Sequence, residues 1–186
     1  MIRAARRWVR EDAAFVAVAP CLVGATDTPR GGALAAPLRA LTYSGARALL
    51  DALHLPYTAH VERFTLARGA ASITVTGACS GLLPLAIWCA VMFVTPLPWR
   101  RKAPHLLAGA LLLQAMNVAR TAHLFQLVAL GSPRFDLYHE WLWPGANLGV
   151  IFGYPLLLLL AQRWAGAADR AGGPGDGAER REGVAL

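Results

Sequence analysis

Three long apolar runs constrain this chain more than any other feature of its sequence. They cover about residues 80–99, 104–130 and 145–164. Each is near the length of roughly 20 residues that a helix needs to cross about 30 Å of hydrocarbon. Because 56% of the residues are apolar and only 16% are charged, the composition does not fit an ordinary soluble domain. We therefore predict an all-α integral membrane protein.

A shorter apolar run lies near the N-terminus, at about residues 8–25. Its apolar core is short for a span and has the length expected for the core of a signal peptide or for an interfacial segment. We favour a span, which gives about four transmembrane helices within one membrane-embedded domain, residues 1–165. Residues 166–186 are rich in Gly, Ala and charge, and are predicted to form a disordered cytoplasmic tail.

Positive charges flank the apolar runs and predict their orientation. Arginines or lysines precede the first run, fill the turn near residues 100–102, and follow the last run. Since Lys and Arg are retained on the cytoplasmic side, both termini are expected there, with residues 26–78 and 131–144 outside. Cleavage of the first run as a signal peptide would leave the same segments outside. The basic residues form no face with interleaved aromatic residues, so nucleic acid is not an expected partner.

The predicted outer segment carries structure of its own. Across residues 34–55 apolar side chains recur at helical spacing, as in a helix that lies on the bilayer surface, and Pro56 ends this helix. Residues 61–66 and 72–76 alternate apolar and polar side chains, which predicts a short β-hairpin. The hairpin leads directly into Cys79 and would place its thiol at the outer membrane surface.

Cys79 is the strongest candidate for chemistry. A cysteine beside a span is most often a small packing residue, but Ser80 and Gly81 follow this one. Glycine allows close backbone approach, and amide groups at the start of the next helix favour both a thiolate and a developing oxyanion. Cys21 and Cys89 lie within apolar runs without CxxC spacing, so we interpret them as packing residues rather than metal ligands or a disulfide.

Arg120 lies inside an apolar run, where an arginine costs a few kcal/mol unless it snorkels or faces a protein interior. Gln114, Asn117 and Thr121 share its helix face, so this helix is predicted to turn a polar stripe into a bundle. Either a structural polar network or a catalytic site would explain the stripe. Arg120 lies roughly 15 Å below Leu130, and it reaches the outer interface if the helix projects past the hydrocarbon.

His139 is the candidate proton shuttle. It follows the polar loop 131–136 and directly precedes an aromatic stretch, residues 140–144, of the kind that marks a membrane interface. Its expected depth therefore matches that of Cys79. An interfacial histidine without a role is the alternative interpretation, and His123 is a rival base.

These residues, taken together, resemble the exosortase/archaeosortase family of membrane-embedded cysteine transpeptidases. The resemblance rests on Ala-Cys-Ser-Gly-Leu at residues 78–82, Asn-Val-Ala-Arg at residues 117–120, and the histidine at the start of the last span. It covers roughly residues 40–160. Many exosortases have about eight spans, so this chain resembles a compact member. The resemblance implies three catalytic and four supporting residues: Cys79, Arg120 and His139, with Ser80, Gly81, Asn117 and Glu140.

The resemblance also implies a function. It predicts a multi-pass enzyme of a bacterial or archaeal cytoplasmic (inner) membrane, with its active site on the extracytoplasmic side. The expected substrates are secreted proteins whose C-terminal sorting signal has a short motif, a transmembrane helix and a basic cluster. Cys79 would cleave the signal through a thioacyl-enzyme and pass the product to an amine acceptor or to water, with His139 moving the proton and Arg120 holding the oxyanion. Membrane lipids are the other expected partner, and no cofactor or metal is implied.

Two other classes stay open at this point. A non-enzymatic four-span scaffold would explain the hydrophobicity but gives no reason for Arg120 in a span. A histidine-ligated haem membrane protein would need two axial ligands at matching depth, which only His123 and His139 could supply.

Overall fold

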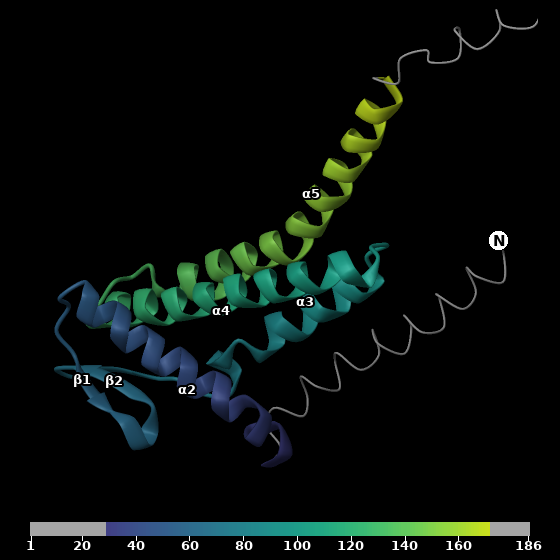
Figure 1. The fold of residues 1–186 in the computed structure, drawn as a ribbon. Helices are drawn as coiled ribbons and strands as arrows, with labels where there is room; N and C mark the ends of the chain where they lie inside the picture. Colours follow the sequence, from purple (N-terminus) through teal and green to yellow (C-terminus); the bar gives the residue numbers. More distant parts are fainter. Residues whose placement is uncertain (1–28, 172–186) are drawn as a thin grey trace, which may run out of the picture.

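The computed structural model describes residues 29–171. This part of the chain is mostly helical and carries one small sheet, so the predicted helical class is correct and the predicted hairpin is part of a larger sheet (Figure 1). The predicted first span, residues 8–25, lies outside the described residues. The helices are α2 (Pro29–Ala52), α3 (Leu82–Val94), α4 (Trp99–Ala129) and α5 (Trp143–Ala171).

Helix α2 occupies the region predicted to be a surface helix and ends before Pro56, at Ala52. Its buried face packs along α4: Gly45 lies so close to Val118 that a Cβ at residue 45 would sit 2.7 Å from a valine methyl group. Burial raises the pKa of Tyr43, whose hydroxyl donates a 3.4 Å hydrogen bond to the carbonyl of Thr65. The helix is thus joined to both α4 and the sheet.

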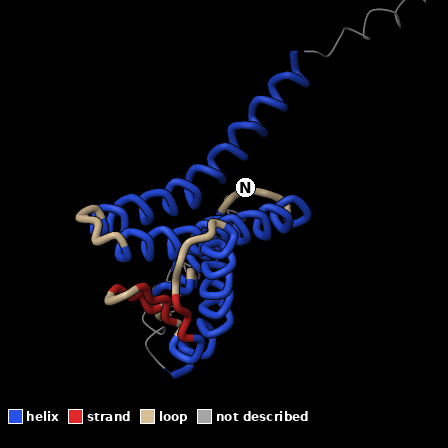
Figure 2. Tube along the Cα trace, turned by 90° about the vertical axis from the view of Figure 1, so that its left-hand side faces the viewer, coloured by secondary structure: helices blue, strands red, loops and turns tan. Residues whose placement is uncertain are grey.

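The sheet has three antiparallel strands in the order β1 (Thr58–His60), β2 (Thr65–Arg68) and β3 (Ala71–Thr74). Strands β2 and β3 form the predicted hairpin and pair from Arg68 with Ala71 to Thr65 with Thr74. The prediction that residues 61–66 form one strand was wrong. Residues 61–63 form a 3-10 turn, and Phe64 has a left-handed backbone (φ 50°) that reverses the chain. In Figure 2 the sheet lies to one side of the helices.

Helix α3 is shorter than the predicted span over residues 80–99. It has 13 residues, which extend about 20 Å. The reason lies in two prolines, Pro96 and Pro98, because proline disfavours a helical conformation in the residue before it. Thr95 is extended accordingly, and its hydroxyl bonds the carbonyl of Val91 at 2.7 Å.

Helix α4 packs against the other three described helices and against the sheet. Its N-terminal half packs against α3 and α5 through a cluster that includes Trp88, Leu113 and Ile151. Its C-terminal half packs against α2 and the sheet through a second cluster that includes Leu50 and Phe125. The predicted span 104–130 therefore corresponds to a helix whose outer half is covered by protein.

Helix α5 follows a π-helical turn, Leu137–Leu142. Within residues 29–171, the continuous stretch Leu137–Ala165 is the one helical segment long and apolar enough to cross a membrane by itself, and the predicted span 145–164 lies inside it. The helix continues to Ala171, six residues past the predicted end of the membrane-embedded domain at residue 165. The remainder of that tail, residues 172–186, lies outside the described residues.

Candidate active site

A cavity of about 180 Å³ brings together the three predicted catalytic residues, Cys79, Arg120 and His139. They come from separate elements. Cys79 lies on a 3-10 turn, Ala78–Ser80, just before α3; Arg120 lies on α4; and His139 lies on the π-helical turn before α5. The sheet side of the cavity is formed by Ile73, Thr74 and Val75.

The Cys79 thiol is free and half-buried. The hydroxyl of Thr76 donates to its Sγ at 3.5 Å. A donor at this position favours the thiolate over the thiol. Thr76 also accepts the amide of Cys79 through its backbone carbonyl at 3.1 Å, so one residue holds both the backbone and the sulfur of the nucleophile candidate. Sequence reasoning did not identify Thr76.

Asn117 connects the cysteine turn to α4. Its side chain is 2% exposed, and Nδ2 donates to the carbonyl of Cys79 at 2.8 Å and to Oγ1 of Thr42 at 3.0 Å. Gln114 Nε2 also donates to Thr42 Oγ1, at 2.8 Å, and Thr42 in turn donates to the carbonyl of Ser80 at 3.3 Å. Helices α2 and α4 therefore clamp the turn that carries the thiol.

Both the backbone conformation and the limited space around residue 81 require a glycine there. Its backbone is left-handed, with φ of 83°, and a Cβ would lie 3.0 Å from Gln114 Oε1 and 3.1 Å from Asn117 Nδ2. Glycine adopts this conformation without the steric penalty that other residues pay. Its neighbour Ser80 is fully buried, and Ser80 Oγ accepts the amide of Leu82 at 3.3 Å.

The backbone amides around the thiol are engaged by the protein itself. The amide of Cys79 bonds the carbonyl of Thr76, and the amide of Ser80 bonds that of Gly77, each at 3.1 Å. The amide of Leu82 bonds Ser80 Oγ. In this structure these three amides therefore donate within the protein itself.

Arg120 stands apart from the polar network on its own helix. Gln114, Asn117 and Thr121 all form hydrogen bonds. Among the described residues, none forms a hydrogen bond or ion pair with Arg120, and its Nε is buried without a partner. The polar stripe of α4 thus contains both a hydrogen-bonded structural network and an arginine that is not part of that network. A guanidinium offers five N–H donors and no acceptor, so these donors remain available to a ligand in the cavity.

The two histidines have different surroundings. The ring of His139 stacks on Phe135, with centroids 5.3 Å apart, and both rings line the cavity. His123 does not line it: its Nδ1 accepts a 3.2 Å hydrogen bond from Trp143 Nε1, and its ring meets the Tyr138 ring edge-on. Geometry thus associates His139, and not its rival, with Cys79 and Arg120. The π-helical turn that presents His139 is a type of distortion often found at functional sites.

Glu140 is the one predicted supporting residue that lies away from the cavity. It is exposed and does not line the cavity. Adjacent side chains on a helical turn project in different directions, so the neighbour of His139 in sequence faces solvent. The other three, Ser80, Gly81 and Asn117, all build the cysteine turn.

Comparison with known proteins found one family. The family model for transmembrane exosortases matches residues 3–161. No curated protein and no solved structure matches the chain significantly.

Proposed function

This chain belongs to the transmembrane exosortase family, and we propose that it is a membrane cysteine transpeptidase that cleaves the C-terminal sorting signals of secreted proteins. The family makes it a membrane protein. The specific reaction, its residues and its substrates are our proposal. One observation carries it: Cys79, Arg120 and His139 line a single cavity although they lie on three different elements.

In the first half of the reaction, the Cys79 thiolate attacks the carbonyl carbon of the scissile peptide bond. The resulting oxyanion is held by the guanidinium of Arg120, whose donors have no partner among the described residues. The C–N bond then breaks, and His139 gives a proton to the leaving amine. The secreted protein remains attached to Cys79 as a thioester.

In the second half, an amine acceptor or water attacks the thioester carbonyl. His139 takes the proton from the attacking group, and the C–S bond breaks to release the Cys79 thiolate. Arg120 holds the second oxyanion as it held the first. The enzyme returns to its starting state, so the cycle needs no oxidant, reductant or cofactor.

The distribution of exposed apolar residues supports a cavity at the outer interface. Leu107 and Leu111 on α4 and Leu157 on α5 are each more than 60% exposed, in the half of the molecule away from the sheet. Trp141 and Trp164 are 72% and 77% exposed and are separated by roughly 35 Å of helix. Tryptophan is enriched at both membrane interfaces. His139 lies at the Trp141 end.

The charges orient this span. Arg163 lies beside Trp164, and Arg100 and Arg101 begin α4 on the same side. By the positive-inside rule this end is cytoplasmic. The active-site cavity then faces the extracytoplasmic side of a bacterial or archaeal cytoplasmic membrane, where a secreted substrate with a C-terminal transmembrane helix would present its motif.

A processing assay tests the proposal. The reporter is a secreted protein fused to a tail from the same genome that has a short motif, a transmembrane helix and a basic cluster. Cys79→Ala should abolish the mobility shift of this reporter, whereas Cys89→Ala should leave it intact, because Cys89 packs between helices away from the cavity. Unchanged processing by Cys79→Ala would refute covalent catalysis by this thiol.

A further inference from the structure

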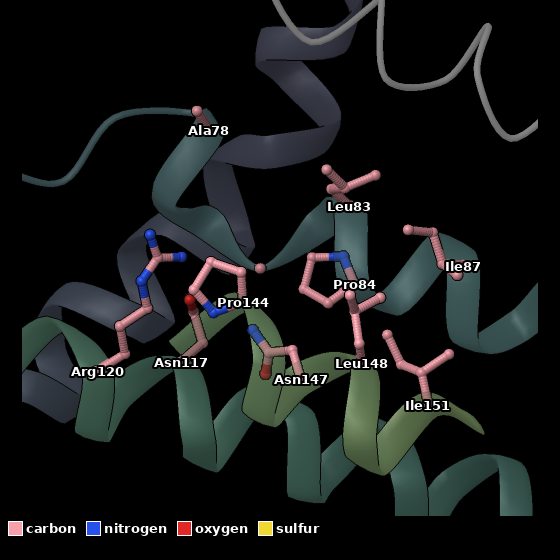
Figure 3. Close-up of a pocket in the computed structure, with 11 residues that line it drawn as sticks. Ala78, Leu83, Pro84, Ile87, Asn117, Arg120, Pro144, Asn147, Leu148 and Ile151 are labelled. Carbon is pink, nitrogen blue, oxygen red and sulfur yellow. The ribbon is translucent and has the colours of Figure 1, made fainter. Parts of the chain in front are cut away.

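A second cavity, of about 220 Å³, adjoins the first and shares Asn117 and Arg120 with it. It lies between the start of α3 and the first turns of α5, and Figure 3 shows Arg120 and Asn117 at one side of it. Apart from these two, its lining is apolar with one exception, Asn147. The principal apolar lining residues are Leu83, Pro84, Ile87, Leu148 and Ile151.

Asn147 is the unexplained residue in this cavity. It is 8% exposed, and its Oδ1 is buried without a hydrogen-bond partner. Figure 3 shows its side chain extending from α5 among the lining residues. A buried amide without a partner destabilises the fold, and nearly all such groups in folded proteins are bonded. Its position in a cavity that continues the candidate active site indicates that a ligand supplies the partner.

The rim of the cavity faces the region expected to hold lipid. Leu83 on α3 and Leu148 on α5 both line it, and they are 41% and 48% exposed. The cavity therefore extends from Arg120 toward an apolar opening between the two helices. The first cavity, by contrast, is bordered by residues 73–75 next to the sheet.

We infer that this second cavity, given the function proposed above, binds the substrate segment that directly follows the cleaved bond. The segment's apolar side chain lies against Ile87 and Ile151, and its backbone is bonded to Asn147. In a substrate with a C-terminal transmembrane helix, the residues after the cleaved bond lead into the membrane, which is the direction in which this cavity runs.

A substrate that is not helical at the cleaved bond would need the hydrogen bonds that Asn147 can provide. The scissile bond is accessible to a thiolate only if the substrate is not helical there, and a non-helical backbone leaves N–H and C=O groups without intrachain partners. At the edge of the membrane such groups must be satisfied by protein. An asparagine amide offers both an acceptor and donors, so one side chain can bind both backbone groups of a residue.

A substitution at Asn147 distinguishes a role in substrate binding from a role in folding. Asn147→Leu should lower reporter processing by about tenfold, the value of one hydrogen bond of ordinary strength. The thermal midpoint of the purified protein should stay the same or rise, because the substitution removes a buried polar group that has no partner in the free protein. A lower midpoint, or unchanged processing, would assign Asn147 a structural role or none and overturn the inference.

Selectivity provides a second test. Once the cleaved bond is located by mass spectrometry of the products, two reporters are made with Ala or Phe as the next residue. Ile87→Phe reduces the cavity and should slow the Phe reporter at least tenfold more than the Ala reporter. Leu111→Phe is the matched control, because Leu111 is exposed on α4 and lines neither cavity. Equal effects of Ile87→Phe on both reporters would contradict the subsite.

Photocrosslinking locates the segment without turnover. A photoreactive residue replaces Leu148 or Leu111 in Cys79→Ala, which retains the uncleaved reporter. Crosslinks are expected at residue 148 only, and to the reporter segment after the cleaved bond. Crosslinks to the segment before that bond, or equal yields at both positions, would reject the assignment. If Cys79→Ala still cleaves the reporter, the proposed function fails. If Cys79 is essential and a subsite test fails, only this inference is lost.

Discussion

The side-chain amide of Asn117 donates a 2.8 Å hydrogen bond to the backbone carbonyl of Cys79. Asn117 also lies three residues before Arg120, so the two side chains project from adjacent turns of one rigid helix. Helix α4 therefore carries both the guanidinium and one of the hydrogen bonds that hold the turn of the thiol. Asn117 is a positioning residue in this account, because it acts through Cys79 and not on the substrate.

Replacing Asn117 should separate its role from that of its neighbour. Asn117→Leu removes the bonds to Cys79 and Thr42, and we expect reporter processing to fall on the order of tenfold to a hundredfold, since buried acceptors lose their donor. Gln114→Leu is the control, because Gln114 bonds Thr42 but not Cys79. Alkylation of Cys79 by a small thiol reagent should change in rate for Asn117→Leu only. Equal losses in both variants would mean that the network is merely structural.

Arg120 should be sensitive even to a substitution that keeps its charge. Arg120→Lys loses the planar fork of donors, and removing one oxyanion donor costs on the order of a hundredfold or more in rate. Because Arg120 has no hydrogen bond or ion pair within residues 29–171, the protein should remain folded and membrane-inserted, as measured by its level and thermal midpoint. Near-normal processing by Arg120→Lys would remove the arginine from catalysis.

We expect the loss of His139 to reduce processing more than the loss of His123, because His139 lines the cavity and His123 does not. His139→Ala should be as damaging to processing as Cys79→Ala, because it removes the proton shuttle. His123→Ala loses a hydrogen bond to Trp143 and a ring contact with Tyr138, both outside the cavity, and should cost little activity. Equal stability with the opposite ranking would make His123 the base.

The orientation can be measured in intact cells. A membrane-impermeant thiol reagent should label Cys79, and it should not label a cysteine introduced at Arg101, which is exposed on the side predicted to be cytoplasmic. Lys102 is unsuitable as the inner site, because it is 2% exposed and its Nζ bonds the carbonyl of Phe93. The reverse labelling pattern would rule out an outward-facing active site.

The convergence of Cys79, Arg120 and His139 was predictable because each could be assigned a depth. Loop charges and the aromatic stretch placed Cys79 and His139 at the same depth along the membrane normal. The rise of a helix placed Arg120 roughly 15 Å below Leu130, at a depth that reaches the interface if α4 projects past the hydrocarbon. Depth says nothing about rotation around a helix. The sequence therefore did not show that Glu140, implied as a supporting residue by the resemblance, lies outside the cavity.

Other contacts were missed for a related reason. Thr42 is a small polar residue on an amphipathic helix, and helical periodicity does not distinguish a buried hydroxyl from an exposed one. Asn147 lies inside an apolar run in which one amide has little effect on mean hydropathy. The short α3 could have been anticipated from Pro96 and Pro98, which lie inside the range predicted as a span.

The central claim is that a substrate becomes covalently attached to Cys79. The direct measurement is mass spectrometry of the unmodified enzyme, quenched with acid while it processes the reporter, before and after treatment with neutral hydroxylamine, which cleaves thioesters. We expect an adduct on the peptide that contains Cys79, of the mass of the reporter cleaved at its C-terminal tail, and its loss on treatment. Processing of the reporter by the unmodified enzyme, with no hydroxylamine-sensitive adduct on Cys79, would contradict the account.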